Sequence, residues 1–147
     1  MKVRGEHLLP LDQEGAWRLL LDTEALARAI PGCEGLVPTG PDEYEMKMKI
    51  VVSSIQGLFA GRVRIADQTP PKSYRLHIEG QGRLGFVRGS GLLTLSPAPA
   101  GGTAVQYDGE VQISGILASV GERMLDATTK MMVGRFFNNL AKVASGP

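Results

Sequence analysis

Apolar and polar residues alternate along most of the chain, a period of two that is typical of β-strands with one buried face. Residues 2–9 alternate in this way until Pro10 ends the segment. The alternation returns at residues 43–50, where Tyr44, Met46 and Met48 share one face and charged residues share the other. It continues, with turn-rich interruptions, to residue 113. The pattern predicts one strand near the N-terminus and six more after residue 32.

Two short helices and one long helix complete the predicted elements. Asp12 and Asp22 precede segments with helical spacing, and an aspartate in this position accepts hydrogen bonds from the first turn of a helix. Pro31 and Gly32 end the second short helix. From about Leu117 to Val143 the apolar period becomes 3.6, which predicts a long helix with a methionine-rich stripe.

These elements predict an α+β fold. The connections between successive strands are short, so we expect an antiparallel sheet. Its apolar, concave face needs a cover, and the long C-terminal helix is the element that can provide it. The length fits one domain over residues 1–147.

Glycine is frequent inside the predicted strands, and the whole chain has 19 glycines. A glycine weakens a strand by roughly 0.5–1 kcal/mol relative to alanine, so each such site needs a structural reason. We expect Gly57, Gly61 and Gly109 to curve the sheet and to clear space beneath the last helix. Between Gly82 and Leu95 we expect a β-bulge. A curved sheet that lacks side chains at these sites predicts a cavity.

The composition indicates a globular protein of nearly balanced charge. The net charge is +1, which predicts no nucleic-acid binding. A single cysteine excludes an internal disulfide and fits a reducing compartment. The first residues lack the apolar run of a signal peptide, and no segment approaches the ~18 apolar residues of a membrane span. We therefore expect a cytoplasmic protein.

The motifs that could carry catalysis are weak. Gly80, Gly82 and Gly85 match the spacing of a dinucleotide-binding loop, but that motif needs a helix directly after it, and the residues that follow are poor helix formers. The two histidines, His7 and His77, have no metal-ligand spacing around them. Nothing resembles a nucleophile elbow or a pair of catalytic carboxylates. The sequence predicts no cofactor, no metal and no catalysis.

One positive signal is a set of apolar and aromatic side chains that should face the cavity. Methionine adapts to irregular apolar shapes, which suits a binder of bulky hydrophobic ligands, although an ordinary core would have a similar composition. His7 shares this face and would equally fit a core position. The predicted ligand-binding residues are His7, Tyr44, Met46, Met48, Phe59, Leu76, Phe86, Tyr107, Val111, Met124, Thr128, Met131 and Met132.

A second signal is a group of basic residues on the opposite, convex face. If three consecutive strands are neighbours, they bring together Lys47, Lys49, Arg62, Arg64 and Arg75. Such a patch could dock an acidic partner or an anionic membrane surface. Glutamates on the same face dilute it, so a solvated surface is the alternative.

Several blocks of the sequence are also similar to a known family. They are Ile30-Pro31-Gly32-Cys33-Glu34, Asp42-Glu43-Tyr44-Glu45, Gly57-x-Phe59-x-Gly61-x-Val63, Pro70-Pro71-Lys72-Ser73-Tyr74, the glycines from Gly80 to Gly91, and Gly115-x-Leu117-Ala118-x-Val120-Gly121-x-Arg123-x-x-Asp126 with Phe136-Phe137. With these blocks the chain resembles the family of the carbon monoxide dehydrogenase G subunit, within the START-like, helix-grip superfamily.

The resemblance implies a seven-stranded curved antiparallel sheet that wraps around a long C-terminal helix, with two short helices after the first strand and an apolar pocket inside. It also implies an accessory role beside a molybdenum hydroxylase of the carbon monoxide dehydrogenase type, with membrane recruitment and a quinone as the candidate ligand. Longer members carry a C-terminal linker and apolar tail, whereas this sequence ends at Ser145-Gly146-Pro147. We expect a carrier without a stable anchor of its own, and peripheral contact with the inner membrane face stays open.

Three hypotheses follow. The first is a non-enzymatic binder of a hydrophobic ligand, a quinone or an isoprenoid lipid, that serves the molybdenum hydroxylase complex at the membrane. The second is an interaction module that recruits the enzyme through its basic face and binds no ligand. The third is an enzyme, for which His7, Tyr44 and Tyr107 are the polar candidates inside the pocket.

Overall fold

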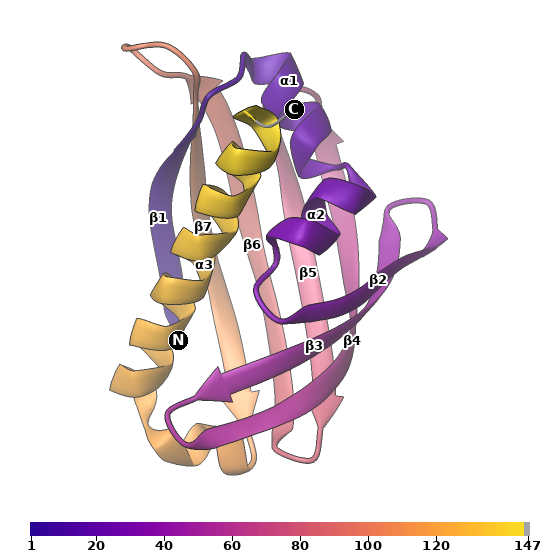
Figure 1. Ribbon diagram of the computed structural model, residues 1–147, viewed down its shortest axis with the longest axis vertical. Coiled ribbons are helices and arrows are strands. Elements are labelled where there is room, and N and C mark those ends of the chain that lie inside the picture. Colours follow the sequence, from indigo (N-terminus) through magenta and orange to yellow (C-terminus); the bar gives the residue numbers. More distant parts are fainter. Residues whose placement is uncertain (146–147) are drawn as a thin grey trace.

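The computed structural model describes residues 1–145 and contains the predicted order of elements, drawn in Figure 1. The N-terminal strand is followed by two short helices, six strands, a short 3₁₀ helix and a long helix. In chain order they are β1 (Lys2–Leu9), α1 (Gln13–Leu20), α2 (Thr23–Ala29), β2 (Cys33–Gly40), β3 (Glu43–Val52), β4 (Ile55–Thr69), β5 (Ser73–Gly82), β6 (Gly85–Pro97), β7 (Thr103–Ser114), η1 (Ile116–Val120) and α3 (Glu122–Ser145).

The seven strands form one antiparallel sheet in the order β1-β7-β6-β5-β4-β3-β2. The first strand therefore lies beside the last, and the long β3–β4 hairpin curls forward at the other end of the sheet (Figure 1). Helix α3 packs along the inner face near β1, and α2 contacts α3 and β2. This arrangement confirms the α+β, helix-grip fold expected from the sequence.

Alternation along the strands separates an inner face, toward α3, from an outer face. On β3 the inner residues Tyr44, Met46 and Met48 are half-buried, while Glu45 and Lys47 between them are exposed. The same period holds on the other long strands, as the sequence predicted.

The predicted caps of the two short helices are confirmed. The backbone N–H of Gly15 donates to the Asp12 carboxylate at 2.8 Å, and that of Ala25 donates to the Asp22 carboxylate at 3.1 Å. Each bond satisfies an N–H of the first turn that has no partner within its own helix. The caps fix where the chain leaves β1 and begins to cover one end of the sheet.

The predicted long helix begins later than the sequence pattern indicated. Residues 116–120 form the 3₁₀ helix η1, and α3 starts only at Glu122. Gly121 separates the two with a φ of 96°, a left-handed conformation that glycine adopts without the cost of a side chain. The apolar spacing of η1 continues that of α3, which is why the sequence pattern predicted a single helix.

Pairs of glycines face each other on neighbouring strands. Gly61 lies opposite Gly80, and Gly109 lies opposite Gly91. A Cβ at Gly61 would overlap the carbonyl oxygen of Glu79, and one at Gly109 would overlap that of Ser90. These glycines let adjacent backbones approach closely where the sheet curls, so their first role is curvature.

The expected β-bulge between Gly82 and Leu95 is wrong. Strand β6 pairs with both β5 and β7 without a register shift, and Gly82 and Gly85 close a two-residue hairpin turn. The register shifts in the described part of the chain lie between β2 and β3 and near the β4–β5 turn. The glycine motif at residues 80–85 is thus a hairpin with no helix after it.

Two separate apolar clusters form the core. The first lies beneath α1, α2 and the C-terminal half of α3, and its buried side chains include Trp17, Tyr74 and Phe137. The second lies at the opposite end, near η1 and the start of α3, and contains Phe59 and Leu125. The inner face between them belongs to neither cluster.

Replacement of Gly61 by alanine should lower the free energy of unfolding by about 2 kcal/mol, because strand β5 must move to admit the Cβ. Gly134→Ala is the matched control. Gly134 lies within α3 with open space at its Cβ position, so alanine should raise the free energy of unfolding by about 1 kcal/mol. Chemical denaturation of both variants tests this, and equal effects at the two sites would contradict the role of the glycine pair.

Candidate functional site

The candidate site is the middle of the inner face, between the two clusters and beside α3. Apolar side chains from four strands and the helix meet here, and every one is only half-buried. We call this set the inner belt; it consists of Met46, Met48, Val63, Ile78, Val111 and Met132. Half-buried apolar side chains at this place leave apolar surface that a hydrophobic ligand could cover.

Strand register aligns the belt with the glycines. Val63 pairs with Ile78, Ile78 with Gly89, and Gly89 with Val111, so one row crosses β4 to β7. The Gly61–Gly80 and Gly91–Gly109 pairs lie on either side of this row. These glycine positions have no side chain to point toward the helix, so the layer of side chains on the middle of the inner face is thin.

Helix α3 presents different residues on its two flanks. Phe137 contacts β1 through His7, whereas the Asn139 side chain on the other flank donates a hydrogen bond to the Ala29 carbonyl of α2 at 3.0 Å. At 100° per residue, Thr128 and Met132 lie within about 20° of Asn139 around the helix axis. Met131 lies opposite the buried Leu140, and Met124 lies beside it; they are 46% and 43% exposed, so both belong to the solvent face of α3.

The polar groups of the inner face gather near β1. The His7 ring stacks on Phe137 with centroids 4.6 Å apart, and the Tyr107 ring lies parallel to His7 at 6.0 Å. Gly5 makes this possible, because a Cβ there would lie 2.6 Å from the Tyr107 hydroxyl oxygen. Burial lowers the pKa of His7 below its ordinary value of 6.5, which favours the neutral imidazole.

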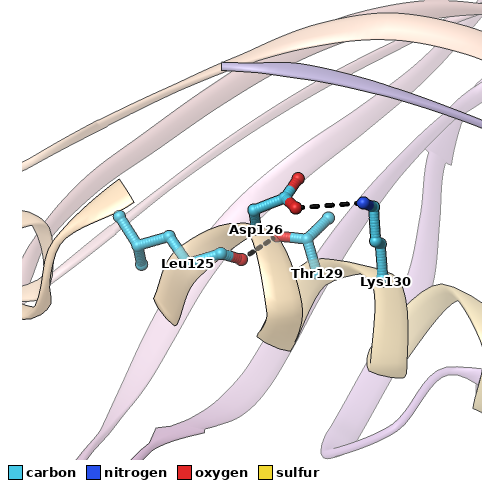
Figure 2. A network of polar contacts seen from close by, with 4 residues as sticks. All are labelled: Leu125, Asp126, Thr129 and Lys130. Atoms are coloured by element: carbon cyan, nitrogen blue, oxygen red, sulfur yellow. Dashed lines mark hydrogen bonds and ion pairs between the residues drawn. The ribbon is translucent and has the colours of Figure 1, made fainter. Parts of the chain in front are cut away.

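Charged residues of α3 lie close to this aromatic group. Burial raises the pKa of Tyr107, and the positive charge of Lys130 partly opposes that shift. Lys130 itself forms an ion pair with Asp126 at 3.1 Å, one helical turn away, as Figure 2 shows. The figure also shows the Thr129 hydroxyl donating to the Leu125 carbonyl at 2.8 Å, so this hydroxyl is engaged within the helix.

The structure divides the predicted ligand-binding residues into three groups. Those on the inner face of the sheet are His7, Tyr44, Met46, Met48, Phe59, Leu76, Tyr107 and Val111. Of these, Phe59 is buried in the second cluster, and Tyr44, Leu76 and Tyr107 pack against the first. Thr128 and Met132 are half-buried on the flank of α3 toward the belt, while Met124 and Met131 are exposed on its solvent face.

Phe86 is placed apart from this site. Val87 beside it packs against the second cluster, so Phe86 points to the outer face, where the Arg88 guanidinium lies 5.7 Å from its ring centroid. Sequence reasoning missed Val63 and Ile78, which occupy the centre of the belt. The alternation on β4 and β5 places both on the inner face, so that signal was present.

The outer face of the sheet is charged and hollowed. One hollow of about 660 Å³ crosses β3 to β7, and another of about 540 Å³ crosses β2 to β4.

Of the predicted partner-binding residues, Arg62 lies between Glu45 and Glu79 in the register, and Arg64 lies beside Glu43. Arg75 pairs with Asp67 at 3.8 Å, while Lys47 and Lys49 lie farther along β3, opposite Ala60 and Leu58. Glutamates on the adjacent strands thus flank Arg62 and Arg64 of the predicted basic patch.

Residues 1–145 contain neither a metal-ligand cluster nor a membrane-spanning helix. No group of three or more His, Cys, Asp or Glu side chains there is placed to hold a metal ion. None of the helices over the same residues combines the length and the apolar character that a membrane crossing requires.

Comparison with known proteins identifies the family. The family model that describes the G subunit of carbon monoxide dehydrogenase (CoxG) matches residues 5–145. The chain belongs to the CoxG family. No curated protein matches the chain significantly.

Solved structures share the architecture of this CoxG-family chain. A conserved protein from Geobacillus kaustophilus is 28% identical with a TM-score of 0.93, over 99% of this chain and 95% of that one. A protein from Thermus thermophilus is 18% identical with a TM-score of 0.74, and each chain is covered completely. The Zhui aromatase/cyclase from Streptomyces sp. R1128 is 14% identical with a TM-score of 0.67, over 99% and 93%. The last two likenesses show the fold alone.

The His7 environment should make stability depend on pH. As pH falls through 6.5, the unfolded chain takes up a proton at His7 before the folded protein does, so the free energy of unfolding should decrease. We expect a larger decrease between pH 7 and pH 5 for the native chain than for His7→Gln, measured by urea denaturation. His77→Gln is the control and should behave like the native chain; a pH profile unchanged by His7→Gln would contradict this prediction.

Proposed function

We propose that this CoxG-family protein is a non-enzymatic accessory protein that binds a hydrophobic small molecule between its sheet and α3. The observation that carries the proposal is the division of the core into two clusters with a half-buried apolar belt between them. An apolar ligand there would remove the belt from water, which is worth roughly 25 cal/mol for each Å² of apolar surface covered.

The proposed opening lies along the flank of α3 that carries Thr128 and Met132. The opposite flank is closed by the stacking of Phe137 on His7 of β1. Farther along the helix, the hydrogen bond from Asn139 to α2 ties the C-terminal part of α3 in place. A ligand would therefore enter between the N-terminal half of α3 and β3, where long flexible methionine side chains can move aside.

The chemistry of the lining favours a long apolar molecule with one polar end. The belt is aliphatic and methionine-rich, which suits an isoprenoid or acyl chain. His7 and Tyr107 are polar groups on the inner face whose ring N–H and hydroxyl can donate hydrogen bonds to a carbonyl oxygen. A quinone with an isoprenoid tail combines both features, and an isoprenoid lipid shares the tail.

Service to a carbon monoxide dehydrogenase-type molybdenum hydroxylase is part of the proposal, and the family description supports it. Contact with the membrane is supported by exposed apolar side chains around the second cluster. Val51 is 50% exposed at the end of β3, and Ile116 is 56% exposed in η1. Peripheral contact at this end would bring the proposed opening close to the bilayer (Figure 1).

Filling the belt should abolish ligand uptake. Val111→Trp places a large side chain in the central row, so the expected result is loss of co-purifying quinone or lipid in native mass spectrometry after mild extraction. Uptake of an added short-chain ubiquinone, measured by equilibrium dialysis from the ultraviolet absorbance of the quinone, should be lost in the same variant relative to the native chain.

Gln106→Trp is the control for this experiment. Gln106 lies on the same strand but is exposed on the outer face, so uptake should match that of the native chain. A native chain that carries no ligand after mild extraction and ignores the added quinone would contradict the proposal. So would equal uptake by the native chain and a folded Val111→Trp variant.

A further inference from the structure

The large hollow of the outer face is lined by two rows of side chains that cross five strands. One row consists of Glu45, Arg62, Glu79, Arg88 and Gln112, and the other of Glu43, Arg64, His77, Ser90 and Glu110. Each strand contributes charge of one sign: β3, β5 and β7 are acidic, and β4 and β6 are basic. We call this surface the striped groove.

The charged side chains of the striped groove do not form ion pairs with one another. Arg62 lies between Glu45 and Glu79 in the register, and Arg88 lies between Glu79 and Gln112. None of these charged groups takes part in an ion pair of 4 Å or less within residues 1–145. Arg62, Arg64 and Arg88 are all exposed. Opposite charges on adjacent strands usually stabilise a sheet by pairing. Here they remain available to groups from outside the chain.

The groove is long enough for an element of secondary structure. The smaller hollow shares Glu45 and Arg62 with the larger one, so together they extend from β2 to β7. At about 4.8 Å per strand, six strands span about 24 Å. An α-helix of about 16 residues has this length. A single small ion could contact the charged side chains of only one strand.

We propose that the striped groove docks an α-helix of another subunit of the carbon monoxide dehydrogenase-type enzyme, one that carries acidic and basic residues alternately along one face. This inference rests on the proposed function for the identity of the partner. Charge complementarity selects the helix, because side chains three or four residues apart on a helix lie about 5–6 Å apart, close to the spacing of the stripes. Acidic residues of the helix would contact β4 and β6, and basic residues would contact β3, β5 and β7.

The docking site and the proposed ligand site lie on opposite faces of the same strands. Val63 faces the belt, while its neighbours Arg62 and Arg64 line the groove. Substitutions in one site therefore need not touch the other. This separation allows the two functions to be tested independently.

The test measures binding of this chain to the purified molybdenum hydroxylase of the same organism by biolayer interferometry. Arg62→Glu/Arg88→Glu reverses both basic stripes of one row, and we expect it to weaken binding by about tenfold or more. Lys72→Glu/Lys142→Glu makes the same change in net charge at exposed sites outside the groove, and it should bind within about twofold of the native chain. Raised ionic strength should weaken the native complex.

Further measurements distinguish a failure of the docking proposal from a failure of the ligand proposal. Arg62→Glu/Arg88→Glu should keep its circular dichroism spectrum and its quinone uptake, while Val111→Trp should keep its affinity for the enzyme even if the ligand proposal fails. Equal weakening by the two double variants, or no binding by the native chain, would overturn the docking proposal. A groove variant that alters only self-association, seen by sedimentation velocity, would overturn it in favour of a second copy of this chain.

Discussion

The inner face of seven strands has one long helix and a few short ones to cover it, and most features of the molecule follow from that constraint. A flat sheet of seven strands spans about 29 Å, whereas a helix with its side chains is about 10 Å wide. The sheet must therefore curl around α3. Curling brings neighbouring backbones together at Gly61–Gly80 and Gly91–Gly109, where a Cβ would meet main-chain atoms of the adjacent strand. The sequence thus encodes the curvature by placing glycine, which has no side chain, at these positions.

The same constraint explains why the core is divided. At one end, α1 adds Trp17 and Leu20 to the cover and α2 adds Ala25 and Ala29, and the first cluster is well buried there. At the other end, η1 and the turn after β5 contribute Leu117 and Leu84 to the second cluster. In the middle only α3 lies above the sheet. The curvature glycines fall in this section, so it has the least side-chain volume at the place where a ligand would sit between the clusters.

Much of the fold could be predicted from the sequence, because period-two alternation and helix caps are local signals. Tyr44, Met46 and Met48 face inward as the alternation indicates, and Asp12 and Asp22 cap their helices. Phe86 shows the limit of this reasoning. The face of the sheet on which Phe86 lies depends on whether β6 contains a bulge. Gly82 and Gly85, which contributed to that expectation, belong instead to a hairpin turn. Met124 and Met131 show another limit, since the apolar stripe on α3 is wider than the surface beneath it.

The outer face could not be predicted from any single segment. The outward charges along β4 are basic and those along β3 are of both signs, so the sequence indicated a basic patch diluted by glutamates, with a solvated surface as the alternative. The stripes appear only when register places Glu45, Arg62 and Glu79 side by side. Because residues alternate across the sheet, Ile78 contributes to the belt while His77 and Glu79 line the groove. The two faces are built on the same backbone, so any change in the curvature of β4 to β7 would alter the width of the belt and the spacing of the stripes together.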